Sequence, residues 1–280
     1  MLIAVVSAKG SPGVSVSALA WTLTWSRPVI LVECDPRGGD FVVGYAHSQA
    51  GQGRDLLAVH MATQRGAAMS TALRDQVLQL GTDRWLLAGV PEPQQAERLD
   101  WTRLGRTLST LEIDVIADCG AVSAISAPRQ VWSAADLVLL ATRSTASAVR
   151  AAQLAIPRLR SDLNELGMGS DRLGVALIDA GHPYSKAEIA AALSPKGADE
   201  VPIVTELPLD VRVAGYLSSG VKVIGNKIFD GSKFASAARR SGLEILTRGV
   251  KLRESTDEVN AFGAAKAPYP ANGVRSGGMS

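Results

Sequence analysis

The feature that most constrains the fold is the alternation of short apolar runs with longer segments of helical spacing. The runs are rich in Val, Ile and Leu, and they are continuous rather than alternating between apolar and polar residues. Continuous runs are typical of strands that are buried on both faces of a sheet. They predict strands at Leu2–Ser7, Val29–Cys34, Trp85–Ala88, Val115–Cys119, Leu137–Thr142, Leu173–Ile178 and Ile203–Thr205.

The segments between these runs place apolar residues at helical spacing. Because strand and helix alternate, we expect an α/β fold with a mostly parallel, twisted sheet of about seven strands and helices on both faces, in a doubly wound arrangement. The less regular stretch Ala46–Gly66 is expected to hold one short helix, Leu56–Met61. The other predicted helices are Val14–Trp25, Gln95–Leu108, Ala146–Leu163, Lys186–Leu193, Val211–Ser218 and Lys233–Leu246.

Length and composition are those of one globular domain. The 280 residues, 46% of them hydrophobic, suffice for one sizeable core, and a net charge of +2 argues against a polycation built for nucleic acid. We expect this domain to span residues 1–250. Residues 251–280, in which Gly, Ala, Pro, Ser and Asn become frequent, are expected to form a disordered tail.

Cysteine use and hydropathy bear on the compartment. Cys34 and Cys119 are the two cysteines, and neither sits in a metal-ligand pair, which favours a reducing environment. The sequence contains no apolar stretch of about 20 residues, and its apolar start is too short for a signal peptide. We therefore expect a soluble, cytoplasmic protein.

The loop after the first predicted strand has the features of a phosphate site. Residues Ser7–Ser15, with the sequence SAKGSPGVS, lead directly into a predicted helix, whose N-terminus offers unpaired N–H groups and partial positive charge. Gly10 and Gly13 permit a tight turn that exposes amides to an anion, and the Ser15 hydroxyl is placed to bind magnesium. A ligand-free Gly/Pro turn is the alternative.

Acidic residues lie at the carboxyl ends of two of the predicted strands. Asp35 follows the second strand, and Asp118 lies at the end of the run Ile113–Cys119. Ligands of open α/β sheets bind at the carboxyl ends of strands, and hydrolysis of a phosphoanhydride needs a carboxylate that places a water in line. Carboxylates are also suitable ligands for magnesium. The alternatives are a turn aspartate before Pro36 and a capped strand end.

Together, these motifs resemble the ParA/MinD family of P-loop ATPases. The deviant Walker A motif of that family runs lysine, Gly, Gly, any residue, Gly, lysine, Ser/Thr. Lys9 matches the first lysine, Ser11 replaces the second glycine, and Val14 stands in place of the usual P-loop lysine. The resemblance covers roughly residues 1–247.

The resemblance implies ATP and Mg²⁺ as cofactors and a set of site residues. Lys9 and Asp35 would be catalytic, with Lys9 reaching across a dimer to the partner's nucleotide, and Ser15, Asp35 and Asp118 would hold the metal. A Pro-x-Asp turn would line the adenine side. The nucleotide-binding residues would be Lys9, Gly10, Ser11, Pro12, Gly13, Val14, Ser15, Val16, Pro208 and Asp210.

Val14 makes hydrolysis doubtful. A charge-assisted contact to phosphate contributes about 1.5–3 kcal/mol, and valine makes no such contact. Backbone amides, magnesium and Lys9 can still bind nucleotide. We therefore expect measurable Mg-ATP binding with slow or lost hydrolysis.

Three function classes follow. The first is an ATP-binding, dimerising ParA/MinD-like switch, forming a nucleotide-dependent homodimer with a partner protein that positions or activates it, in chromosome partitioning or subcellular positioning of cargo. The second is a catalytically inactive pseudo-ATPase scaffold that localises a secretion or pilus-type machinery. The third is a dinucleotide-dependent oxidoreductase, since an acid about 20 residues after a glycine loop also suits a ribose hydroxyl.

The C-terminal third is locally basic. Some ParA/MinD relatives bind DNA without sequence preference through such residues, and others bind membrane through a C-terminal amphipathic helix. Either contact would place the protein at the nucleoid or membrane periphery. A solvated helix face packed on the sheet is the simpler alternative. The basic residues are Lys222, Lys227, Lys233, Arg239, Arg240, Arg248, Lys251 and Arg253.

Overall fold

Eight strands form one continuous sheet in the computed structural model. The model describes residues 1–9, 13–38, 41, 44–45, 53–122, 128–165, 169–179, 183–194, 200–218 and 227–265. The strand order is β3-β4-β2-β5-β1-β6-β7-β8, and every neighbouring pair is parallel apart from β3 and β4. The strands are β1 Leu2–Ser7, β2 Val29–Glu33, β3 Leu78–Gly81, β4 Arg84–Leu87, β5 Asp114–Ala121, β6 Leu137–Arg143, β7 Leu173–Ile178 and β8 Ile203–Leu207.

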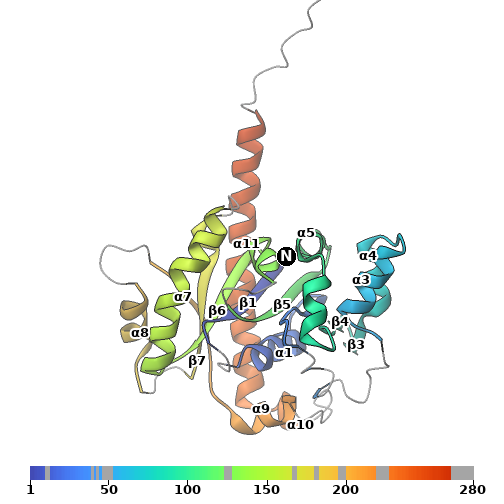
Figure 1. Ribbon diagram of the computed structural model, residues 1–280. Helices are drawn as coiled ribbons and strands as arrows, with labels where there is room; N and C mark the ends of the chain where they lie inside the picture. The colour runs from blue at the N-terminus through green and yellow to red at the C-terminus, as the bar shows by residue number, and fades with distance from the viewer. Residues whose placement is uncertain are drawn as a thin grey trace, which may run out of the picture.

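Helices cover both faces of the sheet, which confirms the predicted α/β class (Figure 1). The buried side chains form two apolar clusters, one on each face. One face carries α3 Leu56–Gln64, α4 Met69–Gln76, α5 Trp101–Ser109, α6 Arg129–Ser133, α7 Ala146–Glu165 and α8 Lys186–Leu193. The other carries α1 Val14–Thr24, α9 Val211–Ser218, α10 Lys227–Asp230 and α11 Lys233–Ala265.

The sheet contains one strand that the sequence pattern does not predict. All seven predicted strands are present with small shifts at their ends, and the eighth, β3, pairs antiparallel with β4 at the edge of the sheet. Asp83, at φ 56°, lies in the tight turn that joins them. β3 has only four residues, and Gln79 between its buried leucines is exposed, so it lacks the continuous apolar run of the other strands.

Some helix boundaries also differ from those predicted. The expected helix Gln95–Leu108 is divided into the 3₁₀ helix η1, Pro93–Arg98, and α5. Asp100 causes this break, because its Oδ1 accepts a hydrogen bond of 2.9 Å from the backbone N–H of Arg103 and so starts a new helix. Helices α4, α6 and α10 were not predicted. A second 3₁₀ helix, η2 Ser170–Arg172, precedes β7.

α11 passes through the expected boundary at residue 250 and runs to Ala265, so the structure has a helix at residues 251–265, where a tail was expected. These residues contain no proline and include good helix formers, and Leu252 is buried against the domain. The last turns of α11 project past the sheet, on the side away from α9 and α10 (Figure 1). The remainder of the expected tail lies outside the described residues. No helix within the described ranges is both long and apolar enough to span a bilayer.

A buried hydrogen bond ties α11 to α1. The indole Nε1 of Trp21 donates to the Ser241 hydroxyl at 2.7 Å, and both residues are at most 1% exposed. Ser241→Ala is expected to lower the free energy of unfolding by about 1–3 kcal/mol, because the indole N–H would lose its partner inside the core. Urea denaturation measures this loss. Ser236→Ala, on the exposed face of the same helix, should change stability little.

Candidate functional site

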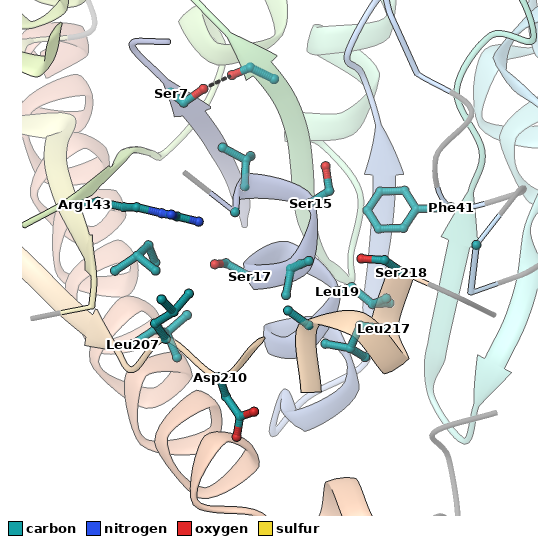
Figure 2. A pocket seen from close by; sticks show the side chains of 18 of the residues that line it. Ser7, Ser15, Ser17, Leu19, Phe41, Arg143, Leu207, Asp210, Leu217 and Ser218 are labelled. Atoms are coloured by element: carbon teal, nitrogen blue, oxygen red, sulfur yellow. Dashed lines mark hydrogen bonds between the residues drawn. The ribbon is translucent and has the colours of Figure 1, made fainter. Parts of the chain in front are cut away.

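A pocket of about 670 Å³ opens at the carboxyl ends of the strands (Figure 2). Its wall is built from the first turns of α1, the ends of β1, β5, β6 and β7, the segment after β2, and the connection from β8 to α9. These elements are far apart in the sequence and meet here because parallel strands end at the same edge. The volume is within the range of small-molecule sites.

The N-terminus of α1 forms one side of this pocket. Gly13 caps the helix at φ 93°, a conformation that favours glycine, and within the described chain no side chain caps the first turn. Its N–H groups are thus available to an anion. Gly13, Val14, Ser15 and Val16, four of the residues that the sequence suggests for nucleotide binding, line the pocket.

The preceding part of the loop is only partly described. The predicted contacts Gly10, Ser11 and Pro12 lie outside the described residues. Lys9 is exposed and does not belong to the pocket wall. The structure therefore does not bring Lys9 together with the other predicted site residues.

Val14 fills the place of the expected lysine with apolar packing. Its side chain is buried, with 6% of its surface exposed, and it belongs to the apolar cluster of the α1 face. The pocket thus lacks a cation at this position.

The two predicted acids lie close together, but only Asp35 lines the pocket, whereas Asp118 is buried and is not part of the pocket wall. Glu33 of β2 lies opposite Asp118 of β5, so Asp35 follows beside Gly120. Gly120 has φ 63°, and a Cβ added to it would lie 2.0 Å from the Asp35 Oδ2 atom. Glycine at this position is what allows the Asp35 carboxylate to pack so closely over the end of β5.

Asp118 is buried and incompletely satisfied. Its Oδ1 accepts a hydrogen bond of 3.0 Å from the Gly120 N–H, whereas Oδ2 has no partner among the described residues. Burial raises the pKa of Asp118 to about 7; hydrogen bonds from the Ser15 hydroxyl and Gly120 oppose the rise, and the charges of Glu33 and Asp35 add to it. The site therefore favours a cation beside Asp118.

The donor set at this position fits magnesium held together with phosphates. Mg²⁺ prefers oxygen ligands and is often bound by one or two carboxylates plus the phosphates of a substrate. Ser15 and Asp118 offer such oxygens, and Asp35 lies nearby. Within the described ranges, no cluster of three His, Cys, Asp or Glu side chains could hold a metal by itself. Phosphate oxygens would have to complete the coordination.

Arg37 forms an ion pair with Asp35. Its Nε and Nη2 atoms donate to Oδ1 and Oδ2 at 3.2 and 2.9 Å, and its backbone N–H donates to Oδ1 at 2.9 Å. The Arg37 side chain is 62% exposed, so solvent weakens this pair. The contact nevertheless occupies the carboxylate that we expected to orient water. Arg37 is not among the site residues predicted from the sequence.

Glu33, the third carboxylate of this region, has a structural role. It is 2% exposed, and its Oε2 accepts a hydrogen bond of 2.8 Å from the Gly89 N–H, while Oε1 accepts one of 3.5 Å from Phe41. Glu33 thus anchors two segments beside the pocket.

The opposite wall contains the two residues predicted for the adenine side. Pro208 and Asp210 both line the pocket. However, Asp210 Oδ1 accepts a hydrogen bond of 2.9 Å from the Val213 N–H and so caps α9, and its side chain points away from Arg143 and Ser17 (Figure 2). This carboxylate is therefore committed to the helix.

Arg143 is a pocket residue that the sequence analysis missed. It is the last residue of β6, and its side chain extends into the pocket toward α1 (Figure 2). The available signal was its position at the carboxyl end of an apolar strand, the same rule that identified the acids.

Solved structures of ParA- and MinD-type ATPases share this fold. A ParA family ATPase from Chlorobium tepidum matches with a TM-score of 0.66 and 20% identity, over 86% of this chain and 98% of its own. The septum site-determining protein MinD of Pyrococcus horikoshii, solved with Mg-ADP, matches at 0.64 and 17%, over 87% and 95%. An ATP complex of a Cyanothece McdA variant matches at 0.61 and 15%, over 91% and 96%. No protein-family model and no curated protein sequence matches the chain.

The strand order argues against the dinucleotide alternative. In the fold that binds dinucleotides, the strand before the glycine loop pairs directly with the strand that carries the ribose-binding acid. Here β5 lies between β1 and β2, because β1 pairs with β5 and β6. Asp35 is thus two strands away from the strand that precedes the loop.

Proposed function

We propose that this protein binds Mg-ATP in the pocket and acts as a ParA/MinD-type switch in the partitioning or positioning of cargo. One observation carries the proposal: Ser15 connects the N-terminus of α1, which no described side chain caps, to the Asp118 carboxylate, one oxygen of which has no partner among the described residues. The first favours an anion and the second a cation. A magnesium-bound polyphosphate supplies both.

Each part of the pocket has a role in this proposal. The N–H groups at the start of α1 bind phosphate oxygens, and Ser15 and Asp118 hold the metal side. Bound magnesium would supply positive charge that offsets the charge of the phosphates. Asp35 would position the attacking water, and Pro208 would lie beside the base. The fold shared with proteins solved with Mg-ADP and with ATP supports this assignment.

Hydrolysis is proposed to be slow. Val14 adds no charge to the pocket, and Arg37 holds the Asp35 carboxylate. These two features also favour the second candidate, a pseudo-ATPase scaffold that localises a secretion or pilus-type machinery. The two candidates differ in whether nucleotide is bound and turned over.

Dimerisation belongs to the same proposal. Lys9 is exposed and lies outside the pocket wall, which suits a lysine that reaches a partner's nucleotide. The homodimer would form with ATP in the cytoplasm, with a partner protein that positions or activates it. The basic C-terminal third is the proposed contact to a DNA or membrane surface.

Isothermal titration calorimetry of the full chain tests the binding. We expect saturable binding of ATP and of a non-hydrolysable analogue, one per chain, and weaker binding when EDTA removes magnesium. Size-exclusion chromatography with the analogue should show a dimer.

The same titration can refute the switch. If neither nucleotide binds at millimolar concentration in the presence of magnesium, the switch is excluded and the scaffold remains. CMP serves as the control ligand, because it has one phosphate and a smaller base.

A further inference from the structure

The pocket contains an arginine that has no partner among the described residues. Arg37 and Arg143 are the basic residues among the described residues that line the pocket, and Arg37 is paired with Asp35. Arg143 makes no ion pair with a described carboxylate, and its Nε is buried without a hydrogen-bond partner among the described residues. Polar atoms in such a position are usually satisfied, so an unpaired one inside a pocket suggests that a ligand completes it.

The sheet register places Arg143 beside the phosphate-binding loop. β6 pairs in parallel with β1, and Ala141 lies opposite Ser7, so Arg143 stands level with the start of the loop. Side chains two residues apart on a strand point to the same face. Ala141 belongs to the apolar cluster on the α1 face, and the side chain of Arg143 is extended on that face, toward α1 (Figure 2).

Arginine is chemically suited to this position. The planar guanidinium presents several N–H donors that match two phosphate oxygens at once. It approaches the pocket from β6, whereas a P-loop lysine would approach from residue 14 of α1. A phosphate chain lying over the first turn of α1 would thus contact helix amides on one side and a guanidinium on the other.

We propose that Arg143 binds the phosphate chain of the nucleotide and supplies the positive charge that Val14 does not. This inference rests on the proposed function, since it requires a nucleotide in the pocket. Beyond the proposed function, the inference is that a positive charge contacts the phosphates from the end of β6. The ligand class is accordingly a nucleoside di- or triphosphate.

Calorimetry of Arg143→Gln with ATP, ADP and adenosine tests the inference. We expect the dissociation constants of ATP and ADP to rise about 10- to 100-fold, which is the range for a lost charge-assisted contact. Adenosine has no phosphate, so its weak binding should not change. Arg150→Gln removes an exposed arginine outside the pocket wall and serves as the matched control.

A double-mutant cycle tests the division of charge. If Val14→Lys supplies the same charge from α1, the penalty of Arg143→Gln should shrink when Val14→Lys is present. Arg143→Lys keeps the charge without the planar fork, so its ATP affinity should fall between those of the wild type and Arg143→Gln. If Arg143→Gln does not fold, judged by circular dichroism, a weakened ATP affinity of Arg143→Lys supports the inference, and wild-type affinity overturns it.

The outcomes separate this inference from the proposed function. If the wild type binds no ATP, both the proposed function and the inference about Arg143 are overturned. If the wild type binds ATP and Arg143→Gln binds it equally well, the inference alone is overturned. An equal loss for adenosine would place Arg143 at the base or ribose, which also overturns it.

Discussion

Asp118→Asn is expected to make the nucleotide-free protein more stable and, at the same time, to remove the gain in ATP affinity that magnesium provides. Asp118 is 1% exposed, and one of its carboxylate oxygens has no partner among the described residues. A charge in that position costs free energy until a cation neutralises it. The amide carries no charge, so it avoids the cost and also loses the magnesium ligand.

The raised pKa of Asp118 also predicts how the stability of the nucleotide-free protein changes with pH. The pKa of Asp118 is about 7 in the folded protein, against an ordinary value of 3.8. Between these values the folded chain holds a proton that the unfolded chain has released, so stability falls as pH rises. The loss is about 1.4 kcal/mol per pH unit and amounts to about 4 kcal/mol above pH 7. Below pH 3.8 this loss of stability is absent, because Asp118 is protonated in both the folded and the unfolded chain.

Urea denaturation of both proteins without nucleotide at pH 5.5 and pH 8 measures the effect. The advantage of Asp118→Asn should be about 2 kcal/mol larger at pH 8, and comparing two pH values cancels the intrinsic effect of the amide. Asp75→Asn, at an exposed position on α4, is the control and should show no such change. An equal advantage at both pH values would contradict the assignment of a raised pKa to Asp118.

Ligand binding provides the second half of the test. Mg-ATP should raise the melting temperature of the wild type, because a ligand that binds the native state stabilises it. It should raise that of Asp118→Asn no more than ATP with EDTA does. A variant that is both more stable and unresponsive to magnesium is the expected signature of a metal ligand. A merely structural aspartate would not show it.

The fold was largely predictable because each strand of a parallel sheet can be recognised from its own short stretch of sequence. Each central strand is a continuous apolar run, and the pattern of the run is independent of its neighbours. β3 was not predicted because it has no continuous apolar run. It is a short, half-exposed edge strand that is defined by its pairing with β4. The end of α11 was not predicted as helix because its composition suggested a tail, although residues 251–265 lack any helix breaker as strong as proline.

The acids of the site were predictable, whereas the pairing of its charges was not. Asp35 and Asp118 each lie at the carboxyl end of an apolar run, and parallel strands bring such ends together. The contact of Arg37 with Asp35 and the unpaired state of Arg143 depend on which side chains meet in space. Position 14 is intermediate, because the missing charge is visible in the sequence, whereas the packing of Val14 in the core is visible only in the folded structure.

The combined variant Val14→Lys/Arg37→Gln is expected to hydrolyse ATP far faster than the wild type. A lysine at position 14 has a stem long enough to leave the apolar cluster and place its ammonium in the pocket, where it would contact the phosphates. Arg37→Gln releases the Asp35 carboxylate, which can then position water. Each change is worth about 1.5–3 kcal/mol if it restores one charged contact in the transition state, so kcat should rise about 10²- to 10⁴-fold together.

Phosphate release at saturating ATP measures this gain in kcat. Val14→Met in place of Val14→Lys provides a side chain of similar length without charge, so this control should show only the smaller gain in kcat that Arg37→Gln provides. Adding Asp118→Asn to the active variant should abolish the gain, which assigns the turnover to this pocket. Since binding and hydrolysis are measured separately, a combined variant that binds ATP without faster turnover would mean that the loss of activity extends beyond these two positions. The pseudo-ATPase scaffold would then be the better description of the protein.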